Sequence, residues 1–347
     1  SLACSWVVTP TRAATESRLP SASAAGSDDA AVIGHGLEKT FAEVTAVDGV
    51  DIRVDREEIY GFLGPNGAGK STLVRMLCTL MRPTAGTAAV AGFDVVTHPQ
   101  AVRLRIGVAL QDAGLDNNQS GRELLRLQGR LYGLRTHEID IRLAQILGMV
   151  DIGDAIDRRI GTYSGGMKRR LDLAASLVHN PQVLFLDEPT TGLDPASRAL
   201  VWHEVRRLNS ELGMTIFLTT QYLEEADQLA DRVGIISQGR IVAEGPPSEL
   251  KRSIGDDVIV AEIEGEDPGV GTRLEQVPGV HHVHIDGHEI SVRAGDGAAT
   301  ISPVAVALSD SHGGGNLRVK SLTLRTPTLD DVFLELTGGH IETNEDQ

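Results

Sequence analysis

Hydrophobic residues alternate with charged ones between residues 47 and 54, as they do in a strand with one exposed face. The next apolar run, Ile59–Leu63, is short and continuous, which is typical of a buried strand, and it leads straight into a glycine-rich segment. Over residues 71–80 the apolar spacing becomes that of a helix with one buried face, and Pro83 and Gly86 end this element. The pattern therefore predicts a strand, a loop and a helix in direct succession.

Three further apolar runs, at residues 106–110, 183–186 and 215–219, predict short buried strands. Between the first two, much of residues 120–180 carries leucines at helical spacing. Strands that alternate with helices are typical of a parallel sheet covered on both faces. We therefore expect a three-layer α/β core.

The pattern changes after Lys251, where strand-like stretches surround one helical stretch near residues 298–308 and predict a small, separate α+β domain. At the other end, residues 1–30 are rich in Ala, Ser and Thr without any periodicity, which predicts a disordered leader. The four C-terminal strand-like stretches are residues 258–263, 282–285, 289–292 and 317–324. The expected organisation is a leader at 1–30, a main domain at 31–250 and an accessory domain at 251–347.

Charge and cysteine content narrow the function classes. The 347 residues include 32 Lys and Arg against 48 Asp and Glu, a formal net charge of −16. An acidic chain is unsuited to general nucleic-acid binding, because neutralising phosphates requires clustered Lys and Arg. No uncharged stretch reaches the roughly 20 residues of a membrane-spanning helix. Two cysteines, Cys4 and Cys78, cannot form a disulfide framework, so we expect a reducing compartment.

The glycine-rich segment matches the pattern G-x-x-x-x-G-K-[ST] of phosphate-binding loops. Its glycines allow backbone N–H groups to point at phosphate oxygens, and the following helix presents its positive end to the same anion. Lys70 would reach the β- and γ-phosphates, and the Ser71 hydroxyl would bind Mg²⁺. An incidental glycine turn is the alternative, which the strand before and the helix after disfavour. The segment reads Gly64-Pro65-Asn66-Gly67-Ala68-Gly69-Lys70-Ser71-Thr72.

Two carboxylates, Asp187 and Glu188, end the apolar run at residues 183–186. A buried strand would bring Asp187 next to the metal, directly or through water. Glu188 would then orient and deprotonate the attacking water. An Asp-Glu pair after a strand is common and is not specific by itself. The phosphate-binding loop in the same chain favours the interpretation that this pair is catalytic.

Ser164-Gly165-Gly166 precedes a helical run that carries Lys168, Arg169 and Arg170. Ser and glycines at a helix N-terminus form an anion site. Cations in the first turns oppose the helix dipole, so we expect them to serve an anionic ligand or a partner. Together with the two motifs above, this segment resembles the signature motif of ABC-type ATPases.

Other segments fit this family in order, over about residues 34–250. Gln111 resembles the Q-loop glutamine, which would also contact Mg²⁺, and Gly192-Leu193-Asp194 resembles the D-loop, with Asp194 at the nucleotide. Phe41 lies where the family places an aromatic residue that stacks on adenine, usually a tyrosine. The resemblance implies a P-loop NTPase fold with a RecA-like core, an antiparallel β subdomain and a helical subdomain that bears the signature.

Gln221 stands where most of the family carries a histidine that contacts the γ-phosphate. An amide can still donate a hydrogen bond but cannot become cationic, so two interpretations stay open: a working uncharged sensor, or impaired hydrolysis. Residues 219–227 and 326–338 also resemble a subgroup, the ATP-binding subunits of daunorubicin-resistance-type exporters.

The resemblance implies a head-to-tail homodimer around two ATP molecules, each held by one chain and capped by Ser164, Gly165 and Gly166 of the other. It further implies a separate transmembrane permease, drug or secondary-metabolite efflux, and a location at the cytoplasmic face of a bacterial membrane. A soluble ABC protein acting on ribosomes or DNA, and a regulatory subunit without hydrolysis, are the alternatives.

Four other features have competing interpretations. The histidines at 281, 282, 284 and 288 could bind a metal, but a solvent-exposed strand and turn is the favoured interpretation. For Cys78, a position in the hydrophobic core is favoured over a redox role. Residues 128–134 could contact the permease or pack as plain helical core. Leu329, Val332 and Phe333 could tie the tail to a folded domain or a dimer mate, or belong to an ordinary amphipathic helix.

Overall fold

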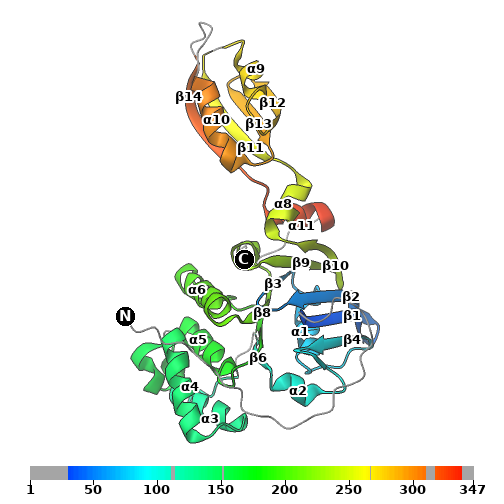
Figure 1. The fold of residues 1–347 in the computed structure, drawn as a ribbon, viewed down its shortest axis with the longest axis vertical. Helices are drawn as coiled ribbons and strands as arrows, with labels where there is room; N and C mark the ends of the chain where they lie inside the picture. Colours follow the sequence, from blue (N-terminus) through cyan, green and yellow to red (C-terminus); the bar gives the residue numbers. More distant parts are fainter. Residues whose placement is uncertain (1–29, 111–113, 151, 266, 310–316, 338–347) are drawn as a thin grey trace.

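The computed structural model describes residues 30–110, 114–150, 152–265, 267–309 and 317–337 (Figure 1). The predicted leader, apart from its last residue, and Gln111 lie outside the described residues.

A six-stranded sheet forms the centre of the larger lobe, in the order β10-β9-β3-β8-β7-β6 (Figure 1). The strands from β9 to β6 are parallel, and β10 is an antiparallel edge strand. The predictions of buried strands at β3, β6, β7 and β8 are therefore confirmed. The bounds are β3 Ile59–Leu63, β6 Ile106–Ala109, β7 Val183–Asp187, β8 Thr215–Thr220, β9 Arg232–Ser237 and β10 Arg240–Gly245.

Successive residues of these strands enter two different hydrophobic clusters, because side chains alternate between the faces of a sheet. Leu186 and Leu218 pack on one face with α5 and α6. Phe185 and Phe217 pack on the other face with α1 and with a second sheet. The expected three-layer α/β core is confirmed. The helices around it are α1 Lys70–Leu77, α5 Gly165–Ser176, α6 Pro195–Leu212 and α7 Leu223–Leu229.

The second sheet is antiparallel, in the order β2-β1-β4-β5, and covers α1. The alternation at residues 47–54 lies in β2, as predicted, whereas β4 and β5 had no clear sequence pattern. This sheet is the antiparallel subdomain that the resemblance implies. Its elements are β1 Ala30–Phe41, β2 Val44–Asp55, β4 Ala85–Val90 and β5 Phe93–Asp94, followed by the short helix α2 Pro99–Arg103.

Residues 120–180 are mostly helical, as predicted. Ser120 begins α3 with a capping box, in which its hydroxyl accepts from the Glu123 amide and the Glu123 carboxylate accepts from the Ser120 amide. Residues of this region pack with α5 and α6 in one cluster on the outer face of the sheet. The helices are α3 Gly121–Leu131 and α4 Thr136–Met149, followed by the 3₁₀ turns η1 Gly153–Asp157 and η2 Ile160–Thr162.

A smaller lobe stands beyond α8 and has its own core (Figure 1). Its antiparallel sheet has the order β12-β13-β11-β14, with α9 and α10 packed against it. The predicted α+β character is confirmed, while the limits 31–250 and 251–347 stay a prediction. The elements are α8 Pro247–Ile254, β11 Asp257–Glu264, α9 Val270–Glu275, β12 Val280–Asp286, β13 Glu289–Ala294, α10 Gly297–Ser309 and β14 Arg318–Arg325.

The last described helix, α11 (Leu329–Thr337), returns from the small lobe to the large one (Figure 1). Leu329, Val332 and Phe333 are buried in a cluster with residues of α7, α8 and β9. The tail thus packs against the large lobe of its own chain. None of the helices within the described residues is long and apolar enough to cross a membrane.

Candidate active site

The candidate site lies at the carboxyl ends of three neighbouring parallel strands. Gly64 follows β3, Glu188 follows β7 and Gln221 follows β8, and these strands are adjacent in the order β3-β8-β7. Open α/β sheets bind ligands at this edge, where the loops of adjacent strands meet.

The loop between β3 and α1 requires its glycines. Gly67 and Gly69 have φ angles of 79° and 110°, in the left-handed region that favours glycine. A Cβ atom on Gly64 would lie 2.5 Å from the Ile236 carbonyl oxygen, and one on Gly69 would lie 2.3 Å from the Ala46 carbonyl oxygen. The backbone can therefore take this cradle shape only with glycine at these positions. Pro65, Asn66, Ala68 and Thr72 complete the turn and the start of α1.

Lys70 is the first residue of α1 and is almost fully buried. Its Nζ atom donates to the carbonyl oxygens of Gly64 at 2.7 Å and Pro65 at 3.1 Å, and lies 3.4 Å from Glu188 Oε1. Burial lowers the pKa of Lys70, and the nearby carboxylates of Glu188 and Asp187 oppose this effect. The structure thus brings together the predicted lysine and the predicted base.

Hydroxyl and carboxylate oxygens meet beside Lys70. Ser71 Oγ donates to Asp187 Oδ1 at 3.2 Å, and Thr219 Oγ1 donates to the same oxygen at 2.6 Å. Oxygen ligands of this kind suit a hard cation such as Mg²⁺. Ser71 and Asp187, two of the three predicted metal ligands, are therefore neighbours in the fold. Thr219 was not predicted, since a threonine at the end of a buried strand carries no distinctive sequence signal.

Glu188 has a left-handed backbone, with a φ angle of 47°, which is rare outside glycine. Its amide donates to the carbonyl and the hydroxyl oxygens of Thr219, and its Oε2 atom accepts from Thr191 Oγ1. These contacts hold the residue in a costly conformation, a condition often found where a side chain must point in one direction.

Gln221 follows β8 and is only 1% exposed. Its Oε1 atom has no hydrogen-bond partner within the described part of the chain. An unpaired buried acceptor costs about 1–3 kcal/mol, which a side chain needed only for packing would avoid. Its position at the strand edge beside Glu188 fits the predicted phosphate sensor.

The signature and D-loop residues lie at two other helix starts. Ser164 caps α5 by accepting from the Met167 amide, and Asp194 caps α6 by accepting from the amide and hydroxyl of Ser197. Gly165 is exposed and Gly166 approaches Ser197. Among the described residues, no hydrogen bond or ion pair joins Ser164 or Asp194 to the cluster around Lys70.

Arg169 corrects one expectation. Its guanidinium is nearly buried and donates to the carbonyl oxygens of Leu110, Asp187 and Pro189, at 2.7, 3.1 and 2.9 Å. The expectation that it serves an anionic ligand or a partner is wrong, because its donors bind three backbone oxygens and the Asp172 carboxylate of its own chain. Arg169 instead fastens α5 to the ends of β6 and β7, a role that only the fold reveals.

Several predicted residues stand outside this cluster. Phe41, at the end of β1, is 44% exposed, and its ring lies 5.2 Å from Lys39 Nζ, so adenine stacking stays a prediction. Cys78 is buried among apolar residues, which raises the pKa of its thiol, and its core position is confirmed. In the small lobe, His281 Nδ1 lies 2.8 Å from Asp256 Oδ2, while His282 and His284 lie exposed on β12.

Comparison with known proteins places these features in a family. The model of the ABC transporter family matches residues 47–191, and the model of the C-terminal domain of DrrA1-3-like ATP-binding proteins matches residues 245–337. The daunorubicin resistance ATP-binding protein DrrA3 of Streptomyces coeruleorubidus is 48% identical over 89% of this chain and 96% of the relative. The Nod factor export ATP-binding protein I of Paraburkholderia xenovorans is 40% identical over 90% of this chain and 99% of the relative.

A solved structure supports the same assignment. The protein cbiO1 of Clostridium perfringens, described as part of the ABC transporter complex cbiONQ, superposes with a TM-score of 0.60 at 28% identity. The match covers 64% of this chain and 91% of that one, so about a third of this chain lies outside it. Sequence and fold agree: the chain belongs to the ABC transporter ATP-binding proteins of the daunorubicin-resistance (DrrA) type, which are ATPases.

Proposed function

We propose that the chain powers the export of a drug or secondary metabolite through a separate transmembrane permease, by hydrolysing ATP bound with Mg²⁺. The observation that carries this proposal is the convergence of Lys70, Ser71, Asp187 and Glu188 at one sheet edge. The printed names of the relatives, which are resistance and export proteins, support the direction of transport.

In this proposal the amides of the glycine loop and Lys70 bind the phosphates of ATP. Lys70 already has carbonyl and carboxylate oxygens around its ammonium group, and phosphate oxygens would replace them. Ser71 and Asp187 would hold Mg²⁺, which neutralises phosphate charge when bound. Glu188 takes the proton of the attacking water, and Gln221 donates its amide hydrogen to the γ-phosphate.

Replacing Gln221 with alanine is expected to lower ATP turnover roughly 10²-fold, because one donor to the developing charge is lost. Nucleotide affinity should change little. Steady-state phosphate release and nucleotide titration measure the two quantities, and Gln228→Ala, an exposed change on α7, is the control. Wild-type turnover in Gln221→Ala would exclude the sensor role. A large gain in Gln221→His would favour the interpretation that glutamine impairs hydrolysis.

The separation of the two parts of the site supports the proposal of a homodimer. Ser164, Gly165 and Asp194 are exposed at the N-termini of α5 and α6, where free amides and helix dipoles attract phosphate. Their own hydrogen bonds stay within those helix starts. A second copy in head-to-tail orientation would bring them onto the ATP held by Lys70.

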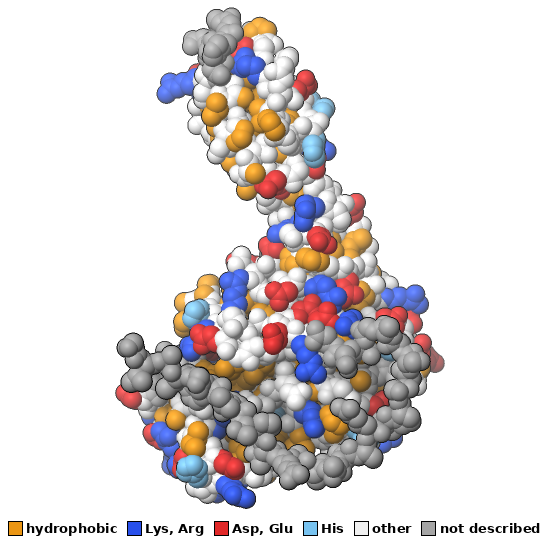
Figure 2. Space-filling view, in the orientation of Figure 1, with side chains coloured by type: hydrophobic (Ala, Val, Ile, Leu, Met, Phe, Trp, Pro, Cys, Tyr) orange, Lys and Arg blue, Asp and Glu red, His pale blue; other side chains and the backbone are white. Residues whose placement is uncertain are grey.

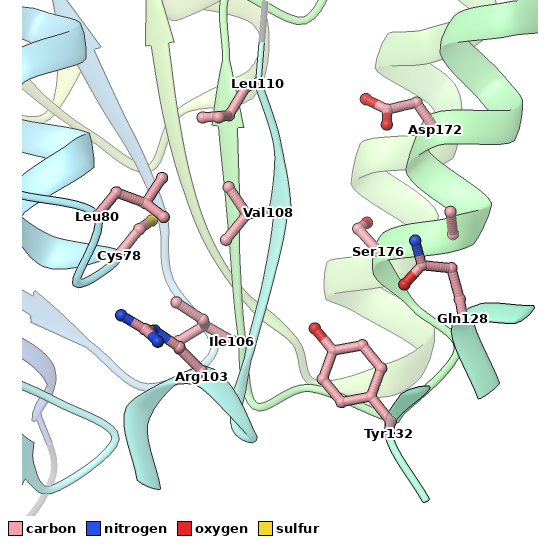
Figure 3. Close-up of a pocket in the computed structure, with 11 residues that line it drawn as sticks. Cys78, Leu80, Arg103, Ile106, Val108, Leu110, Gln128, Tyr132, Asp172 and Ser176 are labelled. Carbon is pink, nitrogen blue, oxygen red and sulfur yellow. The ribbon is translucent and has the colours of Figure 1, made fainter. Parts of the chain in front are cut away.

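The permease is proposed to dock in a groove between the two halves of the large lobe (Figure 3). One wall carries Leu80 and Arg103, the opposite wall carries Gln128 and Tyr132, and the floor is β6. The groove holds about 370 Å³ and includes Leu110, the residue that precedes Gln111 in the sequence. Of the stretch 128–134, Gln128 and Tyr132 thus face the groove, whereas Leu134 packs against the core.

Position and charge are consistent with this assignment. Among the described residues on the face that Figure 2 shows, acidic and basic side chains of the large lobe are interspersed and form no basic stripe of the kind typical of nucleic-acid binding. Docking on a permease would place the chain at the cytoplasmic face of the membrane. A salt-sensitive association with DNA or ribosomes would instead favour the alternative function.

The docking proposal predicts that Leu80→Asp releases the chain from its permease. Leu80 is 56% exposed in the groove wall, so a charge there should disturb the contact more than the fold. Membranes from cells that also make the membrane protein encoded beside this gene should retain wild type and lose the variant at least tenfold. Val306→Asp, at a 65% exposed position of α10, is the control. Equal retention of both variants would contradict docking in this groove.

A further inference from the structure

A buried carboxylate on α7 has no part in the reaction as proposed above. Glu225 lies four residues beyond Gln221 and is fully buried. Burial raises its pKa, against the opposing effects of the nearby Thr220 hydroxyl, of the hydrogen bonds from Thr190 and Trp202, and of the charge of Arg198. A carboxylic side chain in such a place costs more than an apolar one of similar volume unless its contacts serve a purpose.

The contacts of Glu225 reach both sides of the candidate site. Its Oε1 atom accepts from Thr190 Oγ1 at 2.9 Å and from Trp202 Nε1 at 3.0 Å. Thr190 lies two residues beyond Glu188, and Trp202 lies on α6, the helix that Asp194 caps. One oxygen atom therefore connects α7, the helix that follows Gln221, to the loop that follows Glu188.

The second oxygen of Glu225 points to the same conclusion. Oε2 is buried and has no hydrogen-bond partner among the residues that the structure describes. The side chain thus keeps one unpaired oxygen in order to place the other between two donors. Stability alone would favour an apolar residue here, so the paired oxygen must matter for the geometry of the two loops.

We propose that Glu225 is a positioning residue for ATP hydrolysis, which fixes the loop of Glu188 relative to the loop of Gln221. The inference rests on the proposed roles of those two residues. Both groups must reach the same γ-phosphate and its attacking water, and a displacement of about 1 Å can cost 10²-fold in rate. Through their hydrogen bonds to Glu225, Thr190 and Trp202 fix the position of α7 relative to the loop that carries Glu188 and relative to α6.

The first test is a set of three variants of the full-length chain, assayed with Mg-ATP. Glu225→Ala removes the acceptor and should lower kcat 10- to 100-fold, while the KM for ATP changes less than about threefold. Glu225→Gln keeps an acceptor oxygen for both donors and should restore kcat to within about threefold of wild type. Glu224→Ala, the exposed neighbour, is the matched control and should resemble wild type.

The second test removes the donors and guards against a folding defect in Glu225→Ala. Thr190→Val and Trp202→Phe should each lower kcat without lowering Tm in proportion. The double variant Glu225→Ala, Thr190→Val should lose no more kcat than Glu225→Ala alone, because the two changes break the same contact. Unchanged kcat in both donor variants, or a kcat loss matched by equal losses in ATP affinity, would overturn the inference.

Failure of this inference differs from failure of the proposed function. If wild type hydrolyses ATP, Glu188→Gln does not, and the variants of Glu225, Thr190 and Trp202 are all silent, only the positioning role falls. If wild type has no turnover even with its permease, the proposed function and the positioning role fall together.

Discussion

Replacing Glu188 with glutamine is expected to reduce steady-state ATP hydrolysis by at least about 10²–10³-fold while ATP binding persists. An amide has nearly the size of the carboxylate but cannot accept the proton of the attacking water. Its single oxygen can still accept from Lys70 Nζ, which lies 3.4 Å from Oε1 in the wild type, while the amide nitrogen takes the place of Oε2 beside the Thr191 hydroxyl, which can rotate to accept from it. The phosphate-binding loop should therefore keep its shape, and the loss should fall on kcat.

Phosphate release and titration with a fluorescent ATP analogue measure the two effects separately. The variant should also accumulate an ATP-dependent dimer, visible by size exclusion with light scattering, because hydrolysis no longer opens it. Glu224→Gln, at the exposed neighbour of Glu225, is the matched control. Wild-type turnover in Glu188→Gln would refute its role as the base, and a wild type without hydrolysis in the presence of its permease would favour a regulatory subunit.

Replacing Lys70 with alanine is expected to weaken ATP binding by roughly 30- to 4,000-fold, which also removes hydrolysis. Loss of one member of a buried charge pair costs about 2–5 kcal/mol, and Lys70 is the cation that both Glu188 and the phosphates would contact. The variant leaves the Gly64 carbonyl and Glu188 without their donor. Unlike Glu188→Gln, this change should therefore act on affinity first.

Calorimetric titration with Mg-ATP gives the Kd, and thermal unfolding shows whether the fold survives the change. Lys320→Ala, at an exposed lysine of the small lobe, is the control for the loss of one positive charge. If Lys70→Ala bound ATP as tightly as wild type while remaining folded, the cradle around Gly64 and Gly69 would have to bind the phosphates without the lysine.

The strands that carry the site were predictable because each is a short apolar run that ends in a distinctive segment. Ile59–Leu63 leads into the glycine loop, and the run at 183–186 leads into Asp187 and Glu188. The strands β4 and β5 were not, since they are short and partly exposed, and β4 takes its register from β1 while β5 takes its register from β4. The sequence did not predict which part of the molecule α11 packs against, because an apolar helix face shows that the helix is buried but not which surface it contacts.

Sequence alone determined what is local: the phosphate-binding loop, the carboxylate pair and the signature are contiguous segments, so their spacing fixes their chemistry. Only the tertiary structure decided which of them meet. Ser71 and Asp187 stand 116 residues apart yet share a hydrogen bond, because β3, β8 and β7 are neighbours in a sheet whose order follows from burial on both faces. The same packing directs Arg169 toward three carbonyl oxygens and places Glu225 between two donors. A buried polar group needs hydrogen-bond partners, and which groups lie within its reach depends on the packing of segments that are distant in the sequence.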